Sequence, residues 1–211
     1  MITIWGGATS RTLRAHWMIH ELGLEYTPEL IGSRTGATQT KEFRALNPKE
    51  KIPVLVDDDL VLTESVAIVT YLADTYGVET GLVPKPYTIA RAHYNEWASF
   101  IQMELDAHTL YIIRKHRDLA ELYGAAPAAI ETAIAGFNKQ VAVAESRLTE
   151  RPYLLGDTFT AADLLLLTCL DWADIYGITL AETFQSYRDR IHQRSPFQSA
   201  SKLNFSISPG A

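Results

Sequence analysis

Short apolar runs alternate with helical patterns in the first part of the chain. Ile2–Trp5 is apolar and strand-like, and Gly6 and Gly7 break this run. From Ser10 to Leu22 the apolar residues recur at helical spacing, which predicts a helix. The other elements predicted here are strands at 26–31, 52–56 and 60–62 and helices at 41–46 and from 63 to 76. The order β-α-β-α-β-β-α predicts a mixed sheet with helices packed on it.

The pattern changes after residues 77–86, which hold two glycines and two prolines and predict a linker. Strand signals are scarce beyond it. Helices are predicted at 88–117, at 127–148, after Thr160 and at 180–194, whereas the polar tail 199–211 predicts no element. We therefore expect an α/β domain at 1–78, an all-α domain at 88–211, and a linker at 79–87.

Composition and charge narrow the class of protein. The 211 residues are 47% hydrophobic, and the formal net charge of −6 has the wrong sign for a protein that coats nucleic acid. No apolar run is long enough for a membrane span, and the start of the chain lacks the basic region of a signal peptide. The single Cys169 excludes an internal disulfide or a paired-cysteine metal site. We expect a cytoplasmic protein with no metal and no membrane or nucleic-acid partner.

The first segment that could carry chemistry lies between the opening strand and its helix. Thr9 or Ser10 can serve as the N-cap of that helix, which is the simpler interpretation of two hydroxyls there. The same place also suits an anion, because free N–H groups and the helix dipole point toward it.

The second segment opens the third predicted strand at Lys51, Ile52 and Pro53. Most X-Pro bonds are trans, and a trans Pro53 would only limit strand pairing. A cis bond would instead expose the N–H and C=O of Ile52 to a ligand that lies like an extra strand.

The third segment starts the next helix at Thr63, Glu64 and Ser65. In the simpler interpretation Thr63 is the N-cap and Glu64 lies favourably in the first turn. In the functional alternative, the N–H and hydroxyl of Ser65 bind a carboxylate while Glu64 holds an amine. A helix start of this kind could hold the zwitterionic end of an amino acid.

Together these segments resemble the cytosolic glutathione S-transferases over essentially the whole chain. Residues 43–55 match the family's Phe-x-x-Leu-Asn-Pro-x-Gly-Lys-Val-Pro-x-Leu pattern, with Glu50 in place of the glycine. Residues 62–72 resemble its Glu-Ser helix, and 159–163 match its Thr-x-x-Asp helix cap. The resemblance implies a thioredoxin-like first domain, an all-helical second domain, a cis bond before Pro53 and a homodimer.

The resemblance also implies roles for individual residues. The glutathione-binding residues it implies are Arg11, Lys51, Ile52, Pro53, Glu64 and Ser65. Counting back from Gly23 by the family's spacing, its serine-type hydroxyl falls at Thr9, with Ser10 beside it. We expect Thr9 to hydrogen-bond the glutathione sulfur, with Ser10 as the alternative. No metal is implied, because glutathione itself supplies the nucleophile.

The expected reaction is attack of the glutathione thiol on a small hydrophobic electrophile. We expect the substrate wall on one side of the long helix, at Met103, Ala107, Tyr111 and Arg114, although Tyr111 could equally pack between helices. Two alternatives stay open. One is a glutathione-dependent disulfide oxidoreductase or peroxidase on the same fold, and the other is a non-catalytic module with a glutathione transferase-like fold.

Overall fold

A computed structural model describes residues 1–208, and its contacts divide the chain into two compact units. The first unit comprises Met1–Val83 together with the chain from Ile191 onward, and the second comprises Pro84–Arg190. The linker predicted at 79–87 contains this point of division. The last helix, which the sequence analysis placed in the second domain, packs instead within the first unit.

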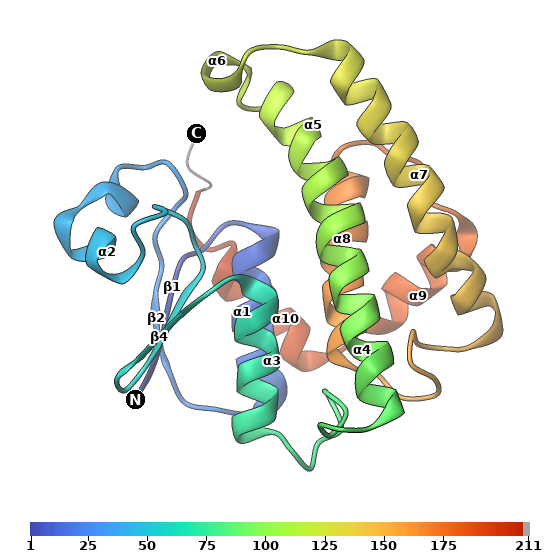
Figure 1. Cartoon of the computed structure of the whole chain (residues 1–211), viewed down its shortest axis with the longest axis horizontal. Coiled ribbons are helices and arrows are strands. Elements are labelled where there is room, and N and C mark those ends of the chain that lie inside the picture. Colours follow the sequence, from blue (N-terminus) through green and yellow to red (C-terminus); the bar gives the residue numbers. More distant parts are fainter. Residues whose placement is uncertain (209–211) are drawn as a thin grey trace. The chain divides into compact units, whose positions relative to one another are not determined.

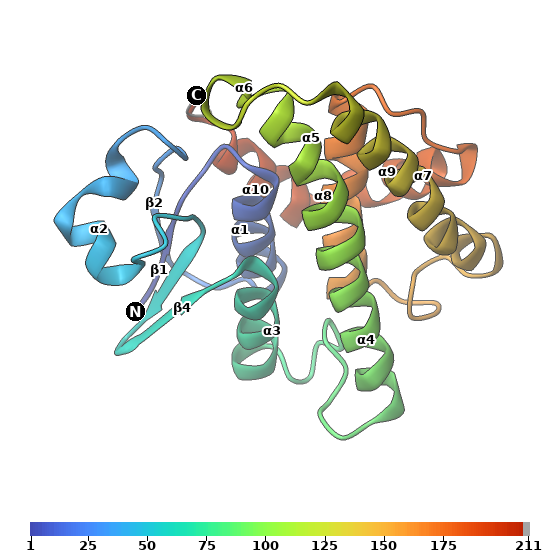
Figure 2. The ribbon, with the colours of Figure 1, turned by 45° about the horizontal axis from the view of Figure 1, so that its top comes forward.

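The first unit is an α/β domain, as expected (Figure 1). Its elements are β1 (Ile2–Trp5), α1 (Ser10–Leu22), β2 (Thr27–Glu29), η1 (Ala37–Gln39), α2 (Lys41–Leu46), β3 (Val54–Asp57), β4 (Leu60–Thr63), α3 (Ser65–Tyr76) and α10 (Ser195–Asn204). Helices α1 and α3 cover one face of the sheet and α2 lies on the other face (Figures 1 and 2).

The sheet is mixed and has the strand order β2-β1-β3-β4. Strand β1 pairs with β2 in parallel and with β3 antiparallel, and β3 and β4 form a hairpin. Pro28 lies in the edge strand β2, where it removes no ladder hydrogen bond. Ile4 and Leu55 of the sheet are fully buried, and so are apolar side chains of the covering helices such as Trp17 and Ile68. This burial supplies the main stabilisation of the unit.

The second unit consists of helices, apart from an isolated bridge between Tyr153 and Gly156 in the described chain. Its helices are α4 (Ile89–Phe100), η2 (Ile101–Leu110), α5 (Tyr111–His116), α6 (Ala120–Tyr123), α7 (Pro127–Glu150) and α8 (Ala161–Ile175), and α9 (Glu182–His192) crosses the boundary. A capping box between Thr160 and Asp163 starts α8, as the sequence predicts. None of the helices within residues 1–208 is long and apolar enough to cross a membrane.

The long helix predicted at 88–117 is present as α4, η2 and α5, which form one continuous rod in Figure 2. Its middle ten residues, η2, are wound as a π-helix. The N–H of Tyr111 accordingly bonds to the C=O of Asp106, five residues earlier. π-helical winding is rare in proteins overall, and where it occurs it often lies at a functional site.

One prediction about the end of the chain is wrong. The tail 199–211 was expected to form no element, but α10 extends to Asn204. Pro196 lies in the first turn of α10, where its missing N–H costs nothing, and Phe197 and Ala200 bury one face of the helix. Residues 209–211 of that expected tail lie outside the described residues.

Candidate functional site

The strand register brings the three candidate segments to one edge of the sheet. Trp5 pairs with Val54, and Val54 pairs with Thr63. The chain leaves β1 through the turn 6–9, enters β3 from the Ile52–Pro53 bond, and leaves β4 directly into α3. All three connections therefore lie side by side.

The turn before α1 is closed by a reciprocal capping box between Thr9 and Thr12. Thr9 Oγ1 accepts the N–H of Thr12 at 3.1 Å, and Thr12 Oγ1 accepts the N–H of Thr9 at 3.2 Å. The two hydroxyl oxygens are 2.9 Å apart. Of the two open choices for the N-cap, the structure assigns the cap to Thr9.

Asn204 of α10 ties this turn to the end of the chain. Its side-chain Nδ2 donates to the C=O of Thr9 at 3.1 Å, and its Oδ1 accepts from Thr12 Oγ1 at 2.6 Å. The C=O of Asn204 accepts the N–H of Ala8 at 2.7 Å. Asn204 is fully buried, and sequence reasoning missed it because the tail was expected to form no element.

Ser10 is the first residue of α1 and is partly exposed. Within residues 1–208 its hydroxyl makes no hydrogen bond. Arg11 follows it on the first turn and is also partly exposed. The turn thus presents one hydroxyl that is engaged, on Thr9, and one that is open, on Ser10.

His16 of α1 hydrogen-bonds to Gly6, at the start of the same turn. Its Nε2 lies 2.9 Å from the C=O of Gly6, and its Nδ1 lies 2.8 Å from the hydroxyl of Tyr26. A carbonyl oxygen only accepts, so Nε2 carries the proton and Nδ1 accepts from Tyr26. Burial lowers the pKa of His16 and raises the pKa of Tyr26 to about 12, so both groups are neutral.

The Ile52–Pro53 bond is cis, in agreement with the implication of the resemblance. The ladder of β3 begins at Val54, so the backbone of Ile52 lies outside the paired residues. Ile52 and Thr12 meet over Gly6, where an added Cβ would lie 2.6 Å from Thr12 Cγ2 and 2.8 Å from Ile52 Cβ. Only glycine allows these two segments to approach so closely.

Asn47 organises the loop that leads to this bond. Its Nδ2 donates to the C=O of Lys51 at 2.7 Å, and its Oδ1 accepts the N–H of Lys49 at 3.1 Å. Glu50, which replaces the glycine of the family pattern, has φ +56° and pairs with Arg44 at 2.8 Å. The loop therefore keeps the left-handed backbone that glycine favours, although the side chain is glutamate. Lys51 is exposed beside it.

The start of α3 differs from the simpler prediction. Thr63 is the last residue of β4, and Glu64, with φ +70°, occupies the cap position, so the prediction that Thr63 caps this helix is wrong. The Glu64 carboxylate lies 2.6 Å from Lys49 Nζ and is 59% exposed. Ser65 is buried as the first residue of α3, and its Oγ accepts from Arg14 Nη1 at 3.3 Å.

The four expected substrate-wall residues share one stripe along η2 and α5 in the second unit. Met103 is exposed, and Ala107, Tyr111 and Arg114 are partly exposed. The ammonium of Lys115 lies 5.3 Å from the centre of the Tyr111 ring. Their role as a substrate wall stays a prediction.

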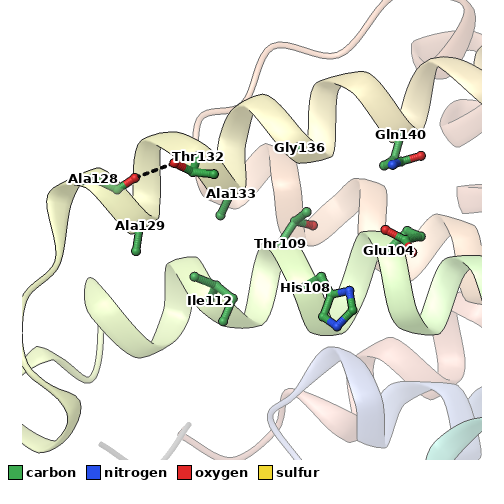
Figure 3. A pocket seen from close by; sticks show the side chains of 10 residues that line it. All are labelled: Glu104, His108, Thr109, Ile112, Ala128, Ala129, Thr132, Ala133, Gly136 and Gln140. Carbon is green, nitrogen blue, oxygen red and sulfur yellow. Dashed lines mark hydrogen bonds between the residues drawn. The ribbon is translucent and has the colours of Figure 1, made fainter.

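A separate cavity of about 540 Å³ lies between this rod and α7 (Figure 3). Small side chains of α7, such as Ala129 and Ala133, face Ile112 and Thr109 across it. The lining in the described chain includes none of the four expected substrate-wall residues. No group of three metal-ligating side chains is found within residues 1–208.

Comparison with known proteins now decides the family. The model of the glutathione S-transferase N-terminal domain matches residues 1–74, and the model of the glutathione S-transferase C-terminal domain matches residues 127–196. The chain belongs to the glutathione S-transferase family. The prediction drawn from residues 43–55, 62–72 and 159–163 is thus confirmed.

Individual members of the glutathione S-transferase family are similar over most of the chain. Glutathione S-transferase GstA of Escherichia coli O157:H7 is 29% identical over 193 residues, covering 90% of this chain and 92% of that protein. Glutathione S-transferase 3 of Zea mays is 34% identical over 164 residues, covering 72% of this chain and 68% of that protein. The theta class enzyme of Xanthomonas axonopodis pv. citri, solved with glutathione bound, has a TM-score of 0.81 at 28% identity and covers 97% of this chain and 99% of that one.

Proposed function

We propose that the protein is a glutathione transferase that ionises the glutathione thiol for attack on small hydrophobic electrophiles. The observation that carries this proposal is the convergence of the α1 turn, the Ile52 backbone and the Ser65 helix start at one sheet edge. Each of the three offers a partner for a different part of an extended tripeptide. Its relatives named glutathione S-transferases support the same activity.

In this proposal the middle of glutathione is bound by Ile52 and its γ-glutamyl end by the start of α3. The N–H and C=O of Ile52 pair with the central peptide group as a further strand would. The Ser65 hydroxyl and N–H bind the γ-glutamyl carboxylate at the helix N-terminus, and Glu64 binds the amine. Pro53 shapes the turn, and Arg11 and Lys51 add positive charge for the carboxylates.

We propose Ser10 as the hydroxyl that donates to the sulfur, ahead of Thr9. The capping box already engages the Thr9 hydroxyl, whereas the Ser10 hydroxyl makes no hydrogen bond to any residue of the described chain 1–208. A free thiol has a pKa of about 8.5, and lowering it by two units requires about 2.7 kcal/mol. One hydrogen bond to a charged group supplies roughly 1.5–3 kcal/mol, and the N-terminus of α1 adds about 0.3–1 kcal/mol. One hydroxyl at this place is therefore sufficient.

Glutathione supplies the nucleophile when it is bound. The sulfur forms a bond to the electrophilic carbon, the bond from that carbon to its leaving group breaks with its electron pair, and the thiol proton passes to solvent. We propose Met103, Ala107, Tyr111 and Arg114 as the wall that receives the electrophile, because this stripe combines apolar surface with a cation. We further propose a cytoplasmic homodimer, and a dimer mass in light scattering at micromolar concentration would support that assembly.

Turnover assays test this proposal. Conjugation of glutathione to an aryl halide, followed by absorbance, should exceed the reduction of a glutathione mixed disulfide. Reductase activity that exceeds conjugation would instead favour a disulfide oxidoreductase. Retention on immobilised glutathione without either activity would favour a binding module.

A further inference from the structure

We propose that Asn204 is a positioning residue for thiol activation, because it fixes the turn that carries Ser10 and directs the Thr9 hydroxyl away from the sulfur. The inference rests on the proposed function, since it concerns how the same site ionises glutathione. It adds a residue from the last helix of the chain to a proposed glutathione site whose other residues lie between positions 9 and 65.

Asn204 makes three hydrogen bonds to the turn and the first residues of α1. Its C=O accepts the N–H of Ala8, its Nδ2 donates to the C=O of Thr9, and its Oδ1 accepts from Thr12 Oγ1. Ala8 has φ +57°, a left-handed conformation that a non-glycine residue keeps only when its surroundings hold it. The hydrogen bond from its N–H to Asn204 is one such restraint.

Chemistry fixes the orientation of the Asn204 amide. The C=O of Thr9 can only accept, so the group facing it must be Nδ2. The group facing Thr12 is therefore Oδ1, which can only accept. Thr12 has one hydroxyl proton, and Oδ1 at 2.6 Å is nearer to it than its other acceptor, the C=O of Thr9 at 2.9 Å. The Thr12 hydroxyl thus donates to Asn204.

This orientation sets the direction of the next hydrogen bond. Because the Thr12 hydroxyl donates its hydrogen bond to Asn204, Thr12 Oγ1 is the acceptor in the 2.9 Å contact with Thr9 Oγ1. The Thr9 hydroxyl donates its only proton there and has none for a sulfur. Ser10 takes no part in these hydrogen bonds, so among residues 1–208 nothing engages its hydroxyl. Asn204 thereby decides which of two neighbouring hydroxyls activates the thiol.

Beyond α10 the chain also passes close to the turn that precedes α1. An added Cβ at Gly7 would lie 3.0 Å from Ile207 Cδ1 and 3.3 Å from the C=O of Asn204. The segment around Asn204 therefore lies directly against the backbone of the turn. A substitution at Asn204 should therefore alter the position of Ser10 and leave Ile52 and Ser65 unchanged, because those two residues belong to other connections.

The test measures the pKa of the bound thiol and the affinity for glutathione in the same variants. Thiolate absorbance of the complex is followed across pH, and glutathione binding is measured by calorimetry. Asn204→Ala removes all side-chain contacts with the turn. Asn204→Asp keeps nearly the same shape and the acceptor for Thr12, but sets an oxygen against the C=O of Thr9 and adds negative charge near the thiolate. It also serves if Asn204→Ala does not fold.

Both variants should raise the pKa of the bound thiol by about one unit, with glutathione affinity within about twofold of the parent protein. Phe197→Leu is the matched control on α10, because Phe197 packs on Trp17 and makes no hydrogen bond with the turn. It should lower stability without moving the thiol pKa.

Two results would overturn the inference. One is an unchanged thiol pKa in a folded Asn204 variant, and the other is an equal shift in Phe197→Leu, which would reduce Asn204 to a packing residue. Failure of the proposed function is separate and would be visible first: the parent protein itself would then bind no glutathione or leave its thiol un-ionised.

Discussion

Substitution of Ser65 by alanine should weaken glutathione binding without changing the ionisation of the bound thiol. The change removes one hydroxyl at the first residue of α3 and leaves the backbone N–H in place. Ser65 is only 6% exposed, so its bond to the γ-glutamyl carboxylate would be shielded from water. A hydrogen bond to a charged group is worth roughly 1.5–3 kcal/mol, which predicts a loss of affinity of about 10- to 160-fold.

Arg14 adds a second consequence to this substitution. Its Nη1 donates to Ser65 Oγ at 3.3 Å, and Arg14 is 1% exposed. Removing the acceptor should lower the free energy of unfolding by about 1 kcal/mol. Affinity must therefore be measured where urea denaturation shows that the variant is fully folded.

Isothermal calorimetry with glutathione is the direct assay, and Ser10→Ala is the matched control. It deletes the same hydroxyl at the neighbouring connection, so it should raise the thiol pKa and leave affinity nearly unchanged. Affinity within twofold of the parent in Ser65→Ala would refute the assignment of the γ-glutamyl carboxylate to this helix start. An equal effect of both variants on affinity would show that the two roles are not separate.

Three further predictions address other parts of the account. Thr9→Ala should lower the free energy of unfolding by about 1 kcal/mol in urea denaturation, because Thr9 is the N-cap of α1; no loss would contradict that role. Tyr111→Ala should change the ranking of electrophiles by kcat/KM while glutathione affinity stays the same; equal losses of both would indicate a packing role. Burial lowers the pKa of His16 and of His20, so their contribution to stability is present above the unfolded pKa of about 6.5 and is lost as pH falls through the lowered pKa values. For the buried His16 the loss is up to about 1.4 kcal/mol per pH unit, and solvent screening makes it smaller for the more exposed His20. Urea denaturation between pH 7.5 and 5 should show this decline, and His16→Gln should reduce its slope.

Local signals explain why most of the fold could be predicted from the sequence. The start of α1 has its hydroxyls and its end has Gly23, which adopts φ +62° as the C-cap. The start of α8 has Thr160 and Asp163 in a capping box. Pro28 indicated the edge strand that the structure contains. Each of these signals lies within the element that it defines, so no distant contact is needed to read it.

The parts that the sequence did not predict depend on distant contacts or on backbone details. Asn204 reaches Thr9 across 195 positions in the sequence, and no local pattern indicates that contact. The local signal for the helix itself is Pro196 followed by apolar residues at helical spacing, within an otherwise polar segment. The choice of Glu64 over Thr63 as the cap depends on a positive φ that few glutamates adopt.

The candidate site is likewise only partly predictable from the sequence. The positions Ile52, Glu64 and Ser65 could be found from the motif, and the sheet register places their connections together. The proposal of Ser10 ahead of Thr9 could not come from the sequence, because it rests on which hydroxyl proton is already engaged. That information lies in the contact between Thr12 and Asn204.

Titration of the thiol in the complex with glutathione tests the central claim most directly. Thiolate absorbance should show a bound thiol pKa about two units below the free value of about 8.5 in the parent protein, and a return toward that value in Ser10→Ala with Thr9→Ala as the comparison. A pKa that rises in Thr9→Ala and not in Ser10→Ala would contradict the assignment to Ser10. A pKa that stays near 8.5 in the parent protein would contradict the claim that this chain activates glutathione.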